Sequence, residues 1–390
     1  MSQTEDSCKK INNNLPTRSI QITISERCNL NCVYCYEHSK DQQCLDVERI
    51  KSIIKEAFLD SVEYPRLEFN FHGGEIALFF DTIKETCEWL WEQPFDKPYI
   101  CFAATNGTLI RGEIKEWFEK NSHRFKLGVS LDGTREMHNK NRSNSFDDID
   151  LDFFLRVYPE QYCKMTVSKE TLPDITEGII FLHKRGFNVN ANLAYGLDWT
   201  NDLLGIYRDQ LVELADFYLQ HPEFNLLNLL AVPIWSVGNN ALHPEQKKPC
   251  KWCGTGNPMV CYSPDGRKYP CQAFMPSTGI KDGDKLLQNI DFKDMSLFQD
   301  PKCEKCPFLP ACPACYGHNY MATETLGLRP EGLCQFRKVE ALAASYVQGK
   351  MLLNHEKYSF TKNMKEFQLV GIAKGVQIIQ QQFADEVERF

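Results

Sequence analysis

Three cysteines near the amino terminus constrain this chain more than any other feature. Cys28, Cys32 and Cys35 follow one another with C-x3-C-x2-C spacing, and Tyr34 precedes the last of them. Three thiolates can hold three irons of a cubane [4Fe–4S] cluster, which normally takes four cysteines. The fourth iron is then open to bind another molecule. A zinc loop is the alternative, but zinc sites require four ligands.

The remaining cysteines also indicate metal binding. The chain has 390 residues and 17 cysteines, nine of which lie between Cys250 and Cys334. Residues 1–16 are polar and lack the apolar core of a signal peptide. We therefore expect a cytoplasmic protein, in which grouped cysteines indicate metal rather than disulfides. Five scattered cysteines are expected to be ordinary thiols: Cys8, Cys44, Cys87, Cys101 and Cys163.

Short β-rich runs alternate with amphipathic segments in the first half of the chain. Strands are expected at 19–24, 67–71, 100–105, 126–131, 163–167 and 189–193. Helices are expected at 46–60, 81–91, 113–120, 174–185 and 203–219, the first with Asp46 as its N-cap. This alternation predicts an α/β fold with a parallel sheet and right-handed crossovers. Polar and glycine motifs follow the strands, at the end where (β/α) barrels build their active sites.

The composition changes after about residue 235. Gly, Pro and Cys interrupt the helical periodicity up to Cys334, and metal clusters can replace an apolar core in such a segment. The residues that follow contain no cysteine and few helix breakers, which predicts a helical tail. We therefore divide the chain into an amino-terminal arm (1–17), an α/β domain (18–235), a cysteine-rich domain (236–335) and a helical tail (336–390).

The C-x3-C-x2-C loop resembles the signature of the radical S-adenosylmethionine (radical SAM) family. The resemblance implies a partial, TIM-like (β/α)6 barrel and a [4Fe–4S] cluster whose open iron chelates SAM. It also implies that SAM is cleaved to a 5′-deoxyadenosyl radical, which abstracts a hydrogen atom from the substrate. Cys28, Cys32 and Cys35 would be the catalytic cluster ligands, and Tyr34 would lie beside the cofactor.

A glycine motif after the second expected strand supports this resemblance. Gly73, Gly74 and Glu75 are similar to the GGE motif of the family, whose backbone and carboxylate contact the amino group of SAM. Glycines allow a ligand to approach the backbone closely. Ile76 stands where a proline is usual.

The stretch 130–142 resembles the SxDG…H-x3-R sequence of peptide-modifying members. The resemblance implies that Ser130 contacts the ribose of SAM. Arg142 would pair with a carboxylate of SAM or of the substrate, and a salt bridge at the barrel rim is the alternative. Ser168 and Leu193 are further candidates for contacts to ribose and adenine.

The second group of cysteines resembles the SPASM domain of radical SAM peptide maturases, which carries two auxiliary [4Fe–4S] clusters. The resemblance assigns one cluster to Cys253, Cys261, Cys271 and Cys315, and the other to Cys303, Cys306, Cys312 and Cys334. The spacer before Cys315 has two residues rather than three, so this ligand is the least secure, and Cys250 is spare or competes with Cys253. The clusters would relay an electron or bind substrate. A zinc ribbon is the alternative, but its cysteine pairs are usually ~15–20 residues apart.

The SPASM resemblance implies a ribosomally made peptide as substrate. We weigh a maturase that forms an intramolecular C–C (cyclophane-type) or thioether cross-link against an anaerobic sulfatase-maturating enzyme, which makes formylglycine, and a peptide epimerase. In sulfatase maturation an aspartate proposed as general base follows a YPC stretch. Here residues 269–271 (YPC) are followed by Gln272, whose amide cannot take up a proton. The sequence therefore favours the cross-linking maturase.

No general base can be assigned from the sequence. Asp132, Glu37 and His72 are expected near the barrel rim, more as structural groups than as bases. A non-enzymatic iron–sulfur scaffold is disfavoured by the GGE motif.

The remaining features concern partners. A formal net charge of −8 disfavours nucleic-acid binding and hence a tRNA-modifying enzyme, and no apolar run is long enough to span a membrane. About 18 residues precede the first strand, so no leader-binding domain is expected there and a separate protein could bind the leader. The expected partners are a precursor peptide and a reductase such as flavodoxin or ferredoxin.

Overall fold

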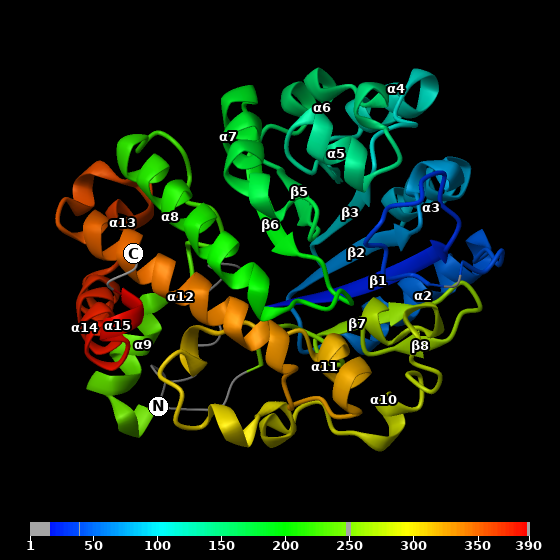
Figure 1. Cartoon of the computed structure of the whole chain (residues 1–390). Helices are drawn as coiled ribbons and strands as arrows, with labels where there is room; N and C mark the ends of the chain where they lie inside the picture. The colour runs from blue at the N-terminus through cyan, green and yellow to red at the C-terminus, as the bar shows by residue number, and fades with distance from the viewer. Residues whose placement is uncertain (1–15, 39, 247–250, 388–390) are drawn as a thin grey trace.

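A parallel β-sheet organises the first half of the protein (Figure 1). The computed structural model describes residues 16–38, 40–246 and 251–387, so Cys8, Cys250 and most of the predicted arm lie outside the described residues. Its parallel strands are β1 (Thr17–Ser25), β2 (Arg66–Gly73), β3 (Tyr99–Thr105), β4 (Phe125–Val129), β5 (Tyr162–Val167) and β6 (Asn188–Leu193). The pairs β1–β2, β2–β3 and β3–β4 are hydrogen-bonded in order, and β5 pairs with β6. The predicted α/β fold with a partial (β/α)6 barrel is confirmed.

A single bridge joins β4 to β5. Ser130 pairs with Lys164, whose carbonyl oxygen accepts from the Leu131 amide at 2.9 Å. The next position uses a side chain, because Asp132 Oδ1 accepts from the Thr166 amide at 2.9 Å. The strand predicted at 126–131 therefore ends earlier, at Val129, where the chain turns toward β5.

Helices cover the outer face of the sheet. They are α2 (Val47–Asp60), α3 (Phe80–Glu92), α4 (Gly112–Lys120), α5 (Arg135–Asn141), α6 (Leu151–Val157), α7 (Ile175–Arg185) and α8 (Leu204–Gln220). Alternate strand residues, such as Ile20 and Ile22, pack with them in one large apolar core. The predicted cap is confirmed, since Asp46 Oδ1 accepts from the Arg49 amide at 2.8 Å.

The helical structure does not stop at residue 235 as predicted, because α9 (Ile234–Leu242) continues past it. This helix is held by tertiary packing that the sequence pattern does not reveal. Gly238 faces Gly371 so closely that a Cβ atom at Gly238 would lie 2.0 Å from the Gly371 carbonyl oxygen. Beyond α9, β7 (Met259–Tyr262) pairs in parallel with β1, so the cysteine-rich segment adds a strand to the barrel sheet.

The rest of the cysteine-rich segment has little regular structure. It contains β8 (Lys268–Tyr269), α10 (Leu286–Asn289), α11 (Tyr316–Thr323) and several 3₁₀ turns. The predicted helical tail is present as α12 (Glu331–Leu352), α13 (Ser359–Lys362), α14 (Glu366–Gln382) and α15 (Ala384–Val387). Helix α12 packs on α8, and α14 packs on α9. In the described part of the chain, no helix combines the length and apolarity that crossing a membrane requires.

Candidate functional site

The three-cysteine loop follows the carboxyl end of β1. Hydrogen bonds donated by its backbone amides hold it to its surroundings. The Val33 amide donates to the Asn141 carbonyl oxygen at 3.0 Å, and the Asn31 amide donates to Ser143 Oγ at 2.9 Å. Within the loop, the Cys35 amide donates to the Cys32 carbonyl oxygen at 3.1 Å. The loop is therefore anchored to the α5 end of the barrel rim.

The three thiols of this loop are half-buried, and Cys28 and Cys35 both lie close enough to act on Cys32. Burial raises the pKa of Cys32 to about 11, although the neighbouring Arg142 opposes this effect and Asp132, Cys28 and Cys35 add to it. Burial likewise raises the pKa of Cys28. Iron binds the thiolate form, so this grouping of thiols beside a cation fits the three protein ligands of an iron–sulfur cluster.

Gly73 and Gly74 bring the end of β2 against the start of the cysteine loop. A Cβ atom would lie 2.4 Å from the Ser25 carbonyl oxygen at Gly73, and 2.3 Å from the Arg27 carbonyl oxygen at Gly74. The Gly74 amide donates to the Ser25 carbonyl oxygen at 3.0 Å. Any side chain at these positions would push the two motifs apart. The packing of one motif against the other therefore requires glycine, apart from any contact with a ligand.

The Glu75 carboxylate is buried and joins β2 to β3. Its oxygens accept from Ala77 N (3.0 Å), Thr105 Oγ1 (2.6 Å) and Asn106 N (2.7 Å). Burial raises its pKa, and these hydrogen bonds oppose that effect. A carboxylate offers about four acceptor positions, so roughly one is left for a ligand.

Asp132 is the centre of the polar network beneath the cysteine loop. It accepts from Tyr34 Oη, from Arg142 Nε at 2.9 Å and from Asn141 Nδ2 at 3.2 Å, in addition to the Thr166 amide. The Arg142 guanidinium also lies over the Tyr34 ring, 5.4 Å from its centroid. The buried pair of Asp132 and Arg142 leaves the two terminal nitrogens of the arginine for other partners.

The other residues predicted to contact SAM lie in different environments. Ser130 is half-buried at the carboxyl end of β4. Ser168 is buried and donates to Asn141 Oδ1 at 2.8 Å, so its hydroxyl is already used. Leu193 packs in the barrel core at 1% exposure, opposite Val167 at the carboxyl end of β6, whereas Asn192 beside it is exposed.

Of the three candidate bases, Asp132 is committed to the network described above. His72 is half-buried, its Nδ1 is buried without a hydrogen-bond partner among the described residues, and burial lowers its pKa to about 4. Glu37 is buried beside the cysteine loop, where burial, and then Glu26, raises its pKa to about 7. Tyr36 adjoins both Cys35 and the second cysteine group, since charges on Cys35, Cys261 and Cys271 all act to raise its pKa, after burial and Glu37.

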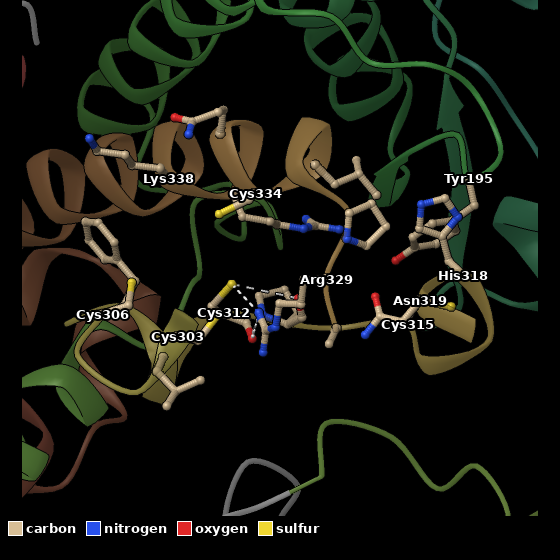
Figure 2. Close-up of a pocket in the computed structure, with 18 of the residues that line it drawn as sticks. Tyr195, Cys303, Cys306, Cys312, Cys315, His318, Asn319, Arg329, Cys334 and Lys338 are labelled. Atoms are coloured by element: carbon tan, nitrogen blue, oxygen red, sulfur yellow. Dashed lines mark hydrogen bonds between the residues drawn. The ribbon is translucent and has the colours of Figure 1, made fainter. Parts of the chain in front are cut away.

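A cavity of about 170 Å³ lies between the start of α12 and the 303–315 loop (Figure 2). All four cysteines that the SPASM resemblance assigns to one cluster line it: Cys303, Cys306, Cys312 and Cys334. Burial raises the pKa of Cys303 to about 11, with smaller contributions from Cys312 and Cys306 in the same direction. A cavity lined by four thiols fits an iron–sulfur cluster.

The other proposed set is less compact. Burial raises the pKa of Cys271, and Cys315 and Cys253 add smaller contributions in the same direction. These three thiols therefore lie close to one another. Cys261 Sγ lies 3.5 Å from Thr23 Oγ1 and 3.6 Å from Met275 Sδ. Cys315 also lines the cavity that Cys303, Cys306, Cys312 and Cys334 share.

All cysteines that the structure describes are free thiols, as expected for metal ligands. Within the same described ranges, no three His, Cys, Asp or Glu side chains are grouped closely enough to hold a single metal ion.

Sequence reasoning missed two residues of these sites. Asn141 joins Asp132, Ser168 and the cysteine loop, yet it lies in a helix with no motif of its own. Arg329 donates from Nη1 to Cys312 Sγ at 2.7 Å, as Figure 2 shows, although it is 17 residues away in sequence. Its only sequence signal was a cation within the cysteine-rich segment.

Known proteins are similar to this chain in sequence and in fold. The profile of the radical SAM superfamily matches residues 22–209. A cysteine-type anaerobic sulfatase-maturating enzyme of Clostridium perfringens is 32% identical over 324 residues, covering 74% of this chain and 85% of the relative. The antilisterial bacteriocin subtilosin biosynthesis protein AlbA of Bacillus subtilis is 25% identical over 333 residues, covering 75% of this chain and 66% of the relative.

Solved structures show the same fold. The sulfatase-maturating enzyme anSMEcpe with bound AdoMet has a TM-score of 0.68 at 20% identity, covering 92% of this chain and 98% of that one. Streptococcus suis SuiB bound to S-adenosylmethionine has a TM-score of 0.55 at 18% identity, covering 83% of this chain and 79% of that one. These structures thus share the barrel and the segment that follows it.

Proposed function

The chain belongs to the radical SAM superfamily, and from this membership we propose that it matures a ribosomally made precursor peptide by forming an intramolecular C–C or thioether cross-link. Relatives by sequence include sulfatase-maturating enzymes and a bacteriocin biosynthesis protein. Among the structural neighbours, SuiB is known bound to its precursor peptide SuiA, with a TM-score of 0.50. A peptide or protein substrate is common to these proteins.

The single observation that carries the choice of reaction is the identity of Gln272. This residue follows Cys271 and is anchored by its amide to Gln21 Oε1 on β1, at 3.1 Å. Its side-chain Oε1 is buried without a hydrogen-bond partner in the structure. An amide at this position cannot accept the proton that formylglycine formation releases.

In this proposal Cys28, Cys32 and Cys35 hold the catalytic cluster. With SAM bound, the cluster supplies a 5′-deoxyadenosyl radical that removes a hydrogen atom from the peptide. Glu75 and the backbone of Gly74 would bind the amino group of SAM. The free nitrogens of Arg142 would bind a carboxylate, because Asp132 fixes the guanidinium through Nε.

We propose the remaining contacts to SAM from the family resemblance and from the surroundings of each residue. Tyr34 and Ser130 would face the ribose, and Leu193 would contact the adenine through its backbone. Ser168 would act indirectly, because its hydroxyl orients Asn141 beneath the cysteine loop.

Two auxiliary clusters complete the proposed cofactor set, with ligands divided as the SPASM resemblance implies. The cavity lined by Cys303, Cys306, Cys312 and Cys334 supports the second set. For the first set, the proximity of Cys253, Cys271 and Cys315 supports three ligands, and Cys261 is proposed as the fourth. A reductase such as flavodoxin or ferredoxin would supply electrons, and a separate protein could present the leader of the peptide.

The test is anaerobic co-expression with a short peptide encoded beside the gene, followed by tandem mass spectrometry. A cross-link predicts the loss of two hydrogens and no fragmentation between the joined residues. Cys32→Ala should abolish this product, and Cys44→Ala should not, because Cys44 is exposed outside both cysteine groups. An unmodified peptide mass would overturn the proposal for that peptide, and deuterium uptake without a mass loss would indicate an epimerase.

Sulfatase maturation is the second candidate, because a sulfatase-maturating enzyme is 32% identical over most of its length. It predicts formylglycine in a sulfatase-motif peptide incubated with the reduced enzyme and SAM. Gln272→Asp would then raise the rate if residue 272 occupies the position of the base. Cleavage of SAM without any change in either peptide would contradict both candidates.

A further inference from the structure

One cation touches a sulfur atom in the cavity lined by the second cysteine set. Arg329 Nη1 donates to Cys312 Sγ at 2.7 Å and to the Cys312 carbonyl oxygen at 3.3 Å (Figure 2). Arg329 is itself one of the residues that line the cavity. Its guanidinium is permanently charged, so a fixed positive charge lies against one proposed cluster ligand.

The other cations of this cavity are neutralised by carboxylates. Arg337 pairs with Glu340 at 2.6 Å, and Lys338 pairs with Glu386 at 2.8 Å. Across the ranges that the structure describes, Arg329 makes no ion pair with a carboxylate, and its side chain donates only to Cys312. The unneutralised positive charge of the cavity is therefore concentrated at Cys312.

The backbone of Arg329 is fixed on both sides. Its amide donates to Asp300 Oδ2 at 2.8 Å, and its carbonyl oxygen accepts from Lys302 Nζ at 2.7 Å. Asp300 is 5% exposed and also caps the turn that carries Cys303, by accepting from the Lys302 amide at 3.0 Å. The cation and the turn bearing another cysteine of the set are thus held by one carboxylate.

We propose that Arg329 raises the reduction potential of the auxiliary cluster held by Cys303, Cys306, Cys312 and Cys334. This inference rests on the auxiliary cluster of the proposed function. Four thiolates make such a cluster an anion, and reduction adds one electron without a proton. Hydrogen bonds to the sulfurs and nearby charge both set the potential of an iron–sulfur cluster. A cation that donates to a ligand sulfur favours the more negative, reduced form.

This assignment gives the two auxiliary sites different tasks. A substrate radical that closes to a stable product must release one electron, and the cluster with the higher potential is the better acceptor. Arg329 would make the cluster beside α12 that acceptor. Arg329 is a positioning residue here, because it acts on the cluster through Cys312 rather than on the peptide.

The test is a redox titration of the reconstituted, full-length protein, in which electron paramagnetic resonance detects the reduced clusters at each potential. A Cys28→Ala/Cys32→Ala/Cys35→Ala background removes the signal of the catalytic cluster. In this background, Arg329→Met removes both charge and donor, Arg329→Gln retains a donor without charge, and Arg329→Lys retains the charge. Lys338→Met is the matched control, because it removes a cavity cation that is paired with a carboxylate.

We expect Arg329→Met to lower the ratio of reduced to oxidised cluster at one auxiliary site at least tenfold at fixed potential, a shift of about 59 mV for one electron. Arg329→Gln and Arg329→Lys should give smaller shifts, and Lys338→Met should give none. Unchanged potentials at full iron content would overturn the inference, and so would loss of the cluster in every Arg329 variant, which would assign the residue to assembly. Iron for only one cluster in the unsubstituted protein would instead contradict the proposed cofactor set.

Discussion

The barrel and the cysteine-rich segment are stabilised by different means. The strands and helices up to α8 share one continuous apolar core. Residues 251–330, all of which the structure describes, form a separate cluster of eleven buried hydrophobic residues and contain no helix longer than the eight residues of α11. Two of the eleven are the proposed ligands Cys261 and Cys271. The barrel therefore has a large apolar core, which also takes in residues of β7 and α12, whereas we expect the segment to depend on what its cysteines bind.

The two regions are nevertheless joined at β7. This strand pairs in parallel with β1, with Gln21 opposite Cys261. The part of the segment nearest the barrel is thus supported by a regular ladder. The 303–315 loop, which packs against α9 and α12 through short turns, lacks such support. Dependence on metal should accordingly increase from β7 toward this loop.

A cysteine substitution in the first motif should cause the largest functional loss with the smallest structural effect. We expect Cys32→Ala to reduce SAM cleavage to the background rate, because the catalytic cluster loses one of its three ligands. The free energy of unfolding of the barrel should change by about 1 kcal/mol or less, since the thiol is half-buried in a loop. Chromatography of 5′-deoxyadenosine and urea unfolding measure the two effects.

Cys44→Ala is the control for this experiment, because Cys44 is an exposed thiol near the same loop. It should retain SAM cleavage. If Cys32→Ala also unfolded the barrel, the view that the barrel is independent of its metal would be wrong.

Removal of iron should show most directly that the two regions differ in their dependence on metal. We expect anaerobic chelation to increase amide hydrogen exchange in residues 300–334 strongly, because four thiols then line a cavity without a ligand. Exchange in β2 and β3 should remain slow, since both strands are central in the sheet. Hydrogen exchange with mass spectrometry measures both rates. Equal acceleration in the two regions would contradict the claim that they depend on metal to different degrees.

The source of an element's stability also explains whether the sequence could predict that element. Helix α2 was predicted because Ile50, Ile53 and Ile54 recur at helical spacing and Asp46 caps them. Helix α9 was missed because its stability comes from contact with Gly371, more than a hundred residues away. Local pattern thus predicts elements whose burial is periodic, and it fails where distant residues decide.

Site residues divide in the same way. The cysteine motifs and the GGE motif are contiguous, so their chemistry could be read directly from the sequence. The donation from Ser168 to Asn141 and the contact between Arg329 and Cys312 depend on side-chain geometry. No spacing in the sequence encodes either contact.

Disruption of the buried ion pair should test how far the barrel relies on its polar network. Asp132→Ala leaves Arg142, which is 8% exposed, without its carboxylate. We expect a loss of about 3–5 kcal/mol in the free energy of unfolding, the usual result of leaving a buried charge unpaired. Asp147→Ala removes an exposed pair with Arg135 and should cost about 1 kcal/mol or less. Equal losses in urea unfolding would contradict a stabilising role for the buried network.

A histidine in this network links barrel stability to pH. The Asp132 amide donates to His138 Nδ1 at 3.3 Å, so Nδ1 carries no proton and Nε2 donates to Ser145 Oγ at 3.2 Å. Burial lowers the pKa of His138 to about 4 from an ordinary value of 6.5. Between these two values the unfolded chain binds more protons than the folded one, so acidification favours unfolding.

Protonation of this histidine should therefore lower the free energy of unfolding by about 2 kcal/mol between pH 7 and pH 5, at ~1.4 kcal/mol per pKa unit. Urea unfolding of His138→Gln should show a correspondingly weaker dependence on pH than the unsubstituted protein. Cysteine titration is common to both proteins and cancels in the comparison. His221→Gln, at an exposed histidine outside the network, should keep the full dependence. If His138→Gln kept it too, the acid sensitivity would belong to other groups, such as His72, instead of His138.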